Sequence, residues 1–178
     1  MKSIIVSLFC FALLSVSGAQ TVKKGKKILI SGTVTSTSNY CGGARPTDEI
    51  IAQLGTPKPV PGKKIYIKKG EENSPESKVI IVLTTDGEGK FHARLRPGKY
   101  FIVDETKKDA SYYNMLLKTY ALQTEHWEAI DQPCLQEWFS RPAAVFEVSE
   151  AAPKIITVNF HKTCEEIPCA RYRGPFRE

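Results

Sequence analysis

Beyond Leu14, the chain has no apolar run that approaches the about 20 residues of a membrane-spanning helix. The catalytic signatures G-x-S-x-G and H-E-x-x-H are missing, and so is a glycine-rich loop of the kind that holds phosphates. No C-x-x-C pair is present, and the lysine-rich stretch over residues 23–27 carries no interleaved aromatic residues. These absences argue against a membrane span, against the common hydrolase and metalloprotease sites, and against nucleic acid as a partner.

The start of the chain has the pattern of a secretory signal peptide. Lys2 supplies a positive charge, residues 4–14 are apolar, and Ser17 and Ala19 stand at the −3 and −1 positions of a cleavage site. The alternative is an apolar N-terminal helix that belongs to the core. The pattern favours removal of residues 1–19, and we expect the protein to be exported, either secreted or periplasmic.

Residues 20–178 have the length of one ordinary domain with a hydrophobic core. The formal net charge of the full chain is +6, which becomes +5 when Lys2 is removed with the signal peptide, and much of it comes from lysines that flank strand-like segments. Lysines at such positions commonly protect sheet edges from aggregation. The alternative is an anionic partner such as a surface polysaccharide. The lysines are Lys23, Lys24, Lys26, Lys27, Lys63, Lys64, Lys68 and Lys69.

Seven short segments have the pattern of β-strands. In the first, Ile28, Ile30 and Val34 share one face, while residues 78–86 form a continuous apolar run that is typical of a buried strand. The strands do not alternate with helices, so we predict an all-β protein, an antiparallel sandwich of about seven strands. The segments are residues 27–35, 63–69, 78–86, 90–95, 96–105, 144–148 and 154–160.

Two loop insertions interrupt the strands and are predicted to be helical. Thr47 is suited to cap a short helix that ends near Gly55. The longer insertion, about residues 105–143, has helical patterns over residues 111–122 and 124–132, and Pro133 opens a further one. It holds both tryptophans, and loops this long in a small domain are often functional.

Four stretches carry a resemblance to a known family: ISGTV, GKKIYI, TTDGEGKF and RLRPGKYFIV. They resemble the carboxypeptidase regulatory-like, or transthyretin-like, β-sandwich, whose pattern is a G-x-V strand, a T-D-x-x-G-x-F hairpin and a P-G-x-Y strand. The match covers most of residues 27–104 and the last strand near 154–160. The parts outside it resemble secreted bacterial proteins that carry this domain. The resemblance implies a docking, folding or ligand-binding module.

The resemblance also implies that the first and last strands pair in parallel. Their ends would then emerge at one pole, where Cys41 follows the first strand and Cys164 and Cys169 follow the last. We expect residues 144–148 and 154–160 to form a hairpin that turns at the other end. The long insertion, which contains Cys134, would therefore return to the sandwich at the same pole as the other cysteines.

Four cysteines, Cys41, Cys134, Cys164 and Cys169, remain after removal of the signal peptide. In an exported protein they predict two disulfides, with three connectivities open. A structural zinc site made from the four is the alternative. His161 falls opposite the apolar face of the last strand, which favours an exposed histidine that binds no metal. We expect no cofactor.

An enzymatic function is the interpretation that the sequence supports least. Residues 172–174, YRG, resemble the C-terminal signature of the hydroxyisourate hydrolases, which share the transthyretin fold. The histidine of that family and its L-D-x-x-x-G-x-P-A stretch are absent from the first strand. His92 and His126 have no recognisable catalytic companions.

The function that these observations predict is a non-catalytic module of the cell envelope or cell surface that docks a protein partner through its loop-rich pole. Arg45, Trp127, Trp138 and Arg173 are the candidate binding residues, because aromatic residues and arginine dominate binding hot spots. The alternative is a glycan-binding module, in which Trp127, Trp138, Tyr112 and Tyr113 stack on sugar rings. A further alternative is that these aromatic residues only pack against the protein itself.

Overall fold

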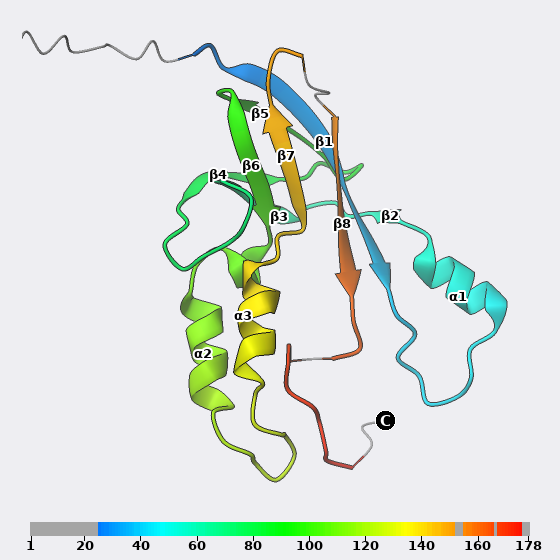
Figure 1. Ribbon diagram of the computed structural model, residues 1–178. Coiled ribbons are helices and arrows are strands. Elements are labelled where there is room, and N and C mark those ends of the chain that lie inside the picture. Colours follow the sequence, from blue (N-terminus) through cyan, green and yellow to red (C-terminus); the bar gives the residue numbers. More distant parts are fainter. Residues whose placement is uncertain (1–24, 152–154, 166, 176–178) are drawn as a thin grey trace, which may run out of the picture.

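The computed structural model describes residues 25–151, 155–165 and 167–175, and the predicted signal peptide lies outside them (Figure 1). The described chain forms eight strands in two four-stranded sheets, with three α-helices and one 3-10 helix. The eighth strand, absent from the prediction, is the two-residue β2 (Lys58–Pro59). Within the described residues, no helix has both the length and the apolarity that crossing a membrane requires.

The first sheet is built around β1 (Ile28–Ser38), which pairs antiparallel with β2 and β5 (Lys90–Leu95). On its other side β1 pairs in parallel with β8 (Ile155–Lys162), as the resemblance implies. Gly32 allows this close approach, because a Cβ there would lie 2.5 Å from the backbone oxygen of Ile156.

The second sheet has the strand order β4-β3-β6-β7 and is antiparallel throughout. Its members are β3 (Lys64–Lys69), β4 (Val79–Thr84), β6 (Gly98–Val103) and β7 (Ala144–Val148). The predicted hairpin of the last two strands is wrong, because β7 pairs with β6 and β8 pairs with β1. Phe146 of β7 stacks on Tyr100 of β6, with ring centroids 5.9 Å apart, which holds β7 in the second sheet.

The two sheets pack against each other through one cluster of buried side chains. Period-two alternation explains its composition, since every second residue of a strand points to the same face. The cluster consists of Ile30, Val34, Ile65, Ile67, Phe91, Ala93, Leu95, Tyr100, Ile102, Val148, Ile156 and Val158.

The apolar run of β4 is not buried, contrary to the sequence-based prediction. Val79, Ile80 and Val82 are 37%, 47% and 53% exposed. The reason is position: β4 is the edge strand of its sheet and pairs only with β3 in the described part of the chain. An apolar run shows that a segment favours a strand, but it does not distinguish a central strand from an edge.

Helix α1 (Asp48–Gly55) occupies the predicted place in the loop that follows β1. Its N-cap is Thr47, whose hydroxyl accepts a hydrogen bond from the backbone N–H of Ile50 at 3.4 Å. No residue of α1 is buried, and the helix projects to one side of the molecule, beside β2 and the end of β1 (Figure 1).

The long insertion forms the 3-10 helix η1 (Glu105–Lys107), then α2 (Ser111–Thr119) and α3 (Gln132–Ser140). The predicted helix over residues 124–132 is wrong, because its backbone has other partners. The N–H of Thr124 donates to the carbonyl of Trp127, and the N–H of Glu128 donates to Arg171 in the C-terminal tail, both at 2.9 Å.

Candidate functional site

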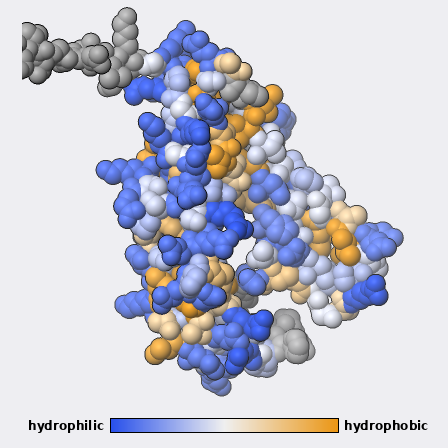
Figure 2. Space-filling view, viewed as in Figure 1, coloured by the Kyte–Doolittle hydropathy of each residue, from blue (hydrophilic) through white to orange (hydrophobic). Residues whose placement is uncertain are grey.

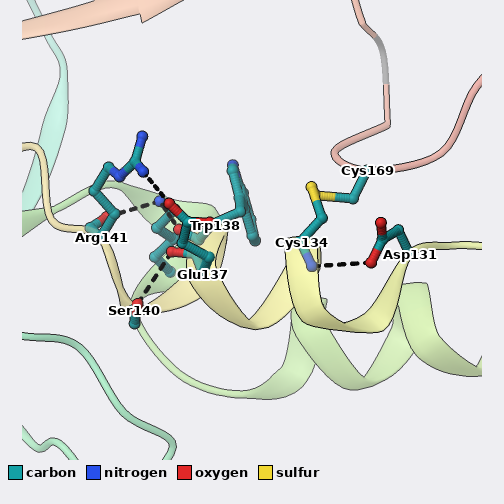
Figure 3. The surroundings of a disulfide bond; sticks show 8 residues. Asp131, Cys134, Glu137, Trp138, Ser140, Arg141 and Cys169 are labelled. Atoms are coloured by element: carbon teal, nitrogen blue, oxygen red, sulfur yellow. Dashed lines mark hydrogen bonds and ion pairs between the residues drawn. A yellow bond between two sulfur atoms is a disulfide. The ribbon is translucent and has the colours of Figure 1, made fainter.

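Two disulfides bind the C-terminal tail to the rest of the molecule. Cys41–Cys164 joins the loop after β1 to the segment after β8, and Cys134–Cys169 joins α3 to the tail (Figure 3). This pairing selects one of the three possible connectivities and excludes the zinc alternative, since no cysteine of the four is left to bind metal. No group of three or more metal-ligating side chains occurs elsewhere among the described residues.

The tail also pairs with the insertion through its backbone. The N–H of Arg173 donates to the carbonyl of His126 at 2.7 Å, and the N–H of Asp131 donates to Cys169 at 3.0 Å. The guanidinium of Arg173 forms an ion pair with Glu128 at 2.5 Å. We call residues 124–131 and 167–175, together with the Cys134–Cys169 disulfide, the clasp.

The clasp and the two insertion helices share a small hydrophobic core of their own, separate from the core between the sheets. Trp127 packs into it, with its ring centroid 5.7 Å from that of Tyr120 and 5.1 Å from that of Tyr172. For Trp127, the structure therefore favours packing within the protein over display to a sugar. The buried members are Leu116, Ile130, Leu135, Ile167 and Ala170.

A cleft of about 560 Å³ lies between the insertion, the end of β8 and the segment after β8. Trp138 and Arg141 line it from α3 and the turn that follows, His161 lines it from β8, and Glu165 from the segment beyond. The space-filling view shows the surface hollowed at this place (Figure 2). Trp138 is the one predicted binding residue that lines the cleft.

The other three predicted residues lie elsewhere. Trp127 and Arg173 come together in the clasp, since Trp127 forms a β-bridge with Tyr172, the residue before Arg173. Arg45 is exposed in the loop that leads to α1. The four candidates thus lie in three places: Trp138 in the cleft, Trp127 and Arg173 in the clasp, and Arg45 in the loop between β1 and α1.

Lys107 is a cleft residue that sequence reasoning missed. Its ammonium donates to the backbone oxygen of Trp138 and, at 2.8 Å, to that of Arg141. It thereby binds free carbonyls at the C-terminal end of α3, where a positive charge is favourable. The same ammonium lies 4.4 Å from the centroid of the Trp138 ring.

Burial lowers the pKa of Lys107 from its ordinary value of 10.5 to about 8, against the opposing effect of Asp104. Because this pKa is lower in the folded state, the unfolded chain holds more protons between about pH 8 and 10.5. The contribution of Lys107 to stability therefore rises as the pH increases through that window.

We expect the fluorescence of Trp138 to titrate with a midpoint near pH 8, because the charge over its ring is lost there. The measurement uses the Trp127→Phe variant, in which Trp138 is the only tryptophan. Adding Lys107→Met should abolish the transition. A midpoint near the ordinary lysine value, or an unchanged transition without Lys107, would contradict this assignment.

His161 is exposed, as expected, and its ring is held by the first sheet. Nδ1 lies 2.9 Å from the hydroxyl of Thr37, and Nε2 lies 2.9 Å from the side-chain oxygen of Asn39. Asn159 donates to the same hydroxyl at 3.0 Å. These polar side chains fix the β8 wall of the cleft.

Lys68 and Asn73 hold η1 and the end of α3, which form the wall of the cleft opposite β8, in place. Lys68 is completely buried, and its ammonium donates to the side-chain oxygen of Asn73 at 2.7 Å. The amide of Asn73 donates to the carbonyls of Lys107 and Phe139, both at 3.1 Å. The prediction that Lys68 protects a sheet edge is therefore wrong, because η1 and the end of α3 cover it.

No family model matches this chain, and neither does any curated protein. The function must therefore be argued from the site itself. Several of its charged groups are already engaged: Asp104 accepts from Thr106, Lys107 binds two carbonyls, and Arg141 pairs with Glu137. Groups held in this way fix the shape of the surface that lines the cleft.

Proposed function

We propose that this protein is an exported, non-catalytic module with a transthyretin-like β-sandwich that docks a protein partner in the cell envelope or at the cell surface. The parallel pairing of β1 with β8 supports the transthyretin-like topology. The two disulfides fit a protein that functions in an oxidising compartment. Docking takes place at the disulfide-reinforced pole, which consists of residues 39–47, about 105–143, 163–165 and 167–175.

The observation that carries the proposal is the rigid construction of the cleft. Each of its walls is fixed, one by paired β-strands, one by the hydrogen bonds of Asn73 and Lys107, and one by the Cys134–Cys169 disulfide. A surface that is ordered before binding loses less conformational entropy when a partner docks. Trp138 offers a half-buried aromatic face and Arg141 an exposed guanidinium, the side-chain types that dominate protein interfaces.

The test is in-cell crosslinking from the cleft, followed by identification of what is captured. A photoreactive residue replaces Glu137, which is exposed and lines the cleft; a second one at Glu150, exposed beyond β7, is the matched control. We expect one protein to be captured from position 137 and not from position 150. With the purified partner, Trp138→Ala should weaken binding at least about tenfold.

Thermal unfolding of the alanine variant distinguishes lost contact from lost structure. An unchanged melting temperature with weaker binding supports docking at the cleft. Equal capture from both positions, or unaltered binding by the variant, contradicts it. Capture of a polysaccharide in place of a protein would establish the glycan alternative, which the packing of Trp127 between Tyr120 and Tyr172 disfavours.

A further inference from the structure

Strand β4 has an unusual surface for an edge strand. Its sequence, VIIVLT, contains five strong strand formers and a leucine, without a charge or a proline. Charged residues and prolines are the common devices that prevent an edge from pairing with another chain. The side chains of Val79, Ile80 and Val82 are between 37% and 53% exposed. Such an edge is a template for strand addition.

The hydrogen bonds next to β4 define which backbone groups face outward. The N–H of Thr85 donates to Lys63 at 3.0 Å, and its carbonyl accepts from Gly62 at 3.1 Å, so Thr85 bonds toward the β3 side. Backbone bonding alternates along an antiparallel pair. The N–H and C=O groups of Thr84 and Val82 therefore point to the free edge.

A bulge limits the length of this edge. The register between β3 and β4 shifts at Ile67 and Lys68, so that Val79 and Ile80 together oppose Lys68. Bulges disrupt the regular ladder locally. The regular part of the free edge is therefore short and centred on Val82.

We propose that β4 pairs antiparallel with β4 of a second copy of this chain, with Val82 opposite Val82 of the partner on a two-fold axis. This register brings the outward backbone groups of the two strands together. It places Ile80 opposite Thr84, so that no charge faces an apolar side chain. It also places Lys78, just before the strand, opposite Asp86, just after it.

The charges select this register over its neighbours. Centring the pair on Ile81 sets Glu76 against Asp86, two like charges, and centring it on Leu83 sets Asp86 against the apolar Ile80. In the proposed register the only like charges that oppose each other are Glu76 and Glu88. Both lie in turns outside the strand, and Glu88 forms an ion pair with Lys90.

The resulting dimer has one continuous sheet made from the second sheets of both copies. Because the interface is isologous, pairing closes at two copies and leaves no further β4 edge to extend. In each copy β7 lies at the other end of the sheet from β4, so the turn into β7 that lines the cleft stays away from the interface. The dimer therefore does not depend on the proposed docking function.

Single cysteines test the register. In an antiparallel pair the two Val82 Cα atoms lie about 5.5 Å apart, within the range that a disulfide spans. Two Thr84 residues would be displaced by four residues along the strands, about 14 Å. We expect Val82→Cys to form a covalent dimer on mild oxidation, while Thr84→Cys, also at an exposed position, stays monomeric on a non-reducing gel.

Sedimentation equilibrium tests the association without added thiols. The wild-type protein should sediment as a dimer at about 100 μM, and Val82→Lys should sediment as a monomer. Ile51→Lys on α1 is the matched control, since both side chains are 53% exposed, and it should remain dimeric. Circular dichroism confirms that both variants are folded. A monomeric wild type, or equal crosslinking of the two cysteine variants, overturns the proposal.

Discussion

Asn73→Ala is expected to lower the free energy of unfolding by about 2–3 kcal/mol, a large effect for one polar side chain. The reason is that its side-chain oxygen is the closest acceptor of the buried Lys68 ammonium, at 2.7 Å. The remaining acceptor, the carbonyl of Lys107, lies 3.3 Å away. Removing the closer acceptor leaves a desolvated charge with one longer hydrogen bond as compensation.

The measurement is urea unfolding of four proteins: wild type, Asn73→Ala, Lys68→Met and the double variant. Because the buried charge causes most of the loss, the double variant should be more stable than the sum of the single effects predicts. Asn114→Ala, an exposed asparagine on α2, is the matched control and should change stability by less than about 0.5 kcal/mol. Strict additivity would show that the charge is not the cause.

The pH dependence adds an independent check. Burial holds the pKa of Lys68 below its ordinary value, and Asp109 opposes that shift. Losing the Asn73 oxygen lowers this pKa further, because the charged form loses a partner. The penalty of Asn73→Ala should therefore shrink as the pH is raised and Lys68 gives up its proton.

The sequence predicts the local parts of this fold well. Period-two alternation identifies Ile30, Val34, Ile156 and Val158 as core residues, and Thr47 with its acidic neighbours identifies the start of α1. These features depend on residues close in the chain. The even number of cysteines in the mature chain and the signal-peptide pattern at the N-terminus together predict the two disulfides, although not their pairing.

Features that depend on contacts between residues far apart in the chain could not be predicted from the sequence. The run in β4 is exposed because none of the described strands lies beyond it, and residues 124–131 avoid a helix because the tail supplies other hydrogen bonds. Lys107 meets Trp138 across 31 positions, and no local pattern marks that contact. Of the predicted binding residues, only Trp138 lines the cleft, although both tryptophans pack against the small core that the clasp shares with the insertion helices.

The two disulfides should differ in what they stabilise. The Cys41–Cys164 bond closes a loop with a sequence separation of 123, and the Cys134–Cys169 bond one of 35. Loop-closure entropy predicts losses of about 5 and about 4 kcal/mol when each pair is replaced by serine. For a domain of this size that is a fall in melting temperature of roughly 10 °C or more in each case, with the larger fall for the first pair.

The loss of local order in the C-terminal tail should be larger for the second pair, Cys134–Cys169, although its loss in melting temperature is smaller. The reason is that the two disulfides hold different segments. Beside Cys41–Cys164, the pairing of β1 with β8 continues up to Asn39, whose N–H donates to Lys162 at 2.9 Å. Beside Cys134–Cys169, the tail depends on a few hydrogen bonds and on two buried side chains, Ile167 and Ala170. The second pair of replacements should therefore release the tail while the sheets remain intact.

Limited trypsin digestion separates these outcomes. In the native protein, Arg171 and Arg173 are held against the insertion by backbone hydrogen bonds, so cleavage after them should be slow. The Cys134→Ser/Cys169→Ser variant should be cut there at least about tenfold faster at a temperature where its sheets stay folded, since local opening there needs less free energy. The Cys41→Ser/Cys164→Ser variant should be cut at close to the wild-type rate, although it melts at the lower temperature. Equal cleavage rates in the two variants would contradict this prediction and would mean that the fold as a whole holds the tail. The wall of the cleft that the tail forms would then persist without the Cys134–Cys169 disulfide.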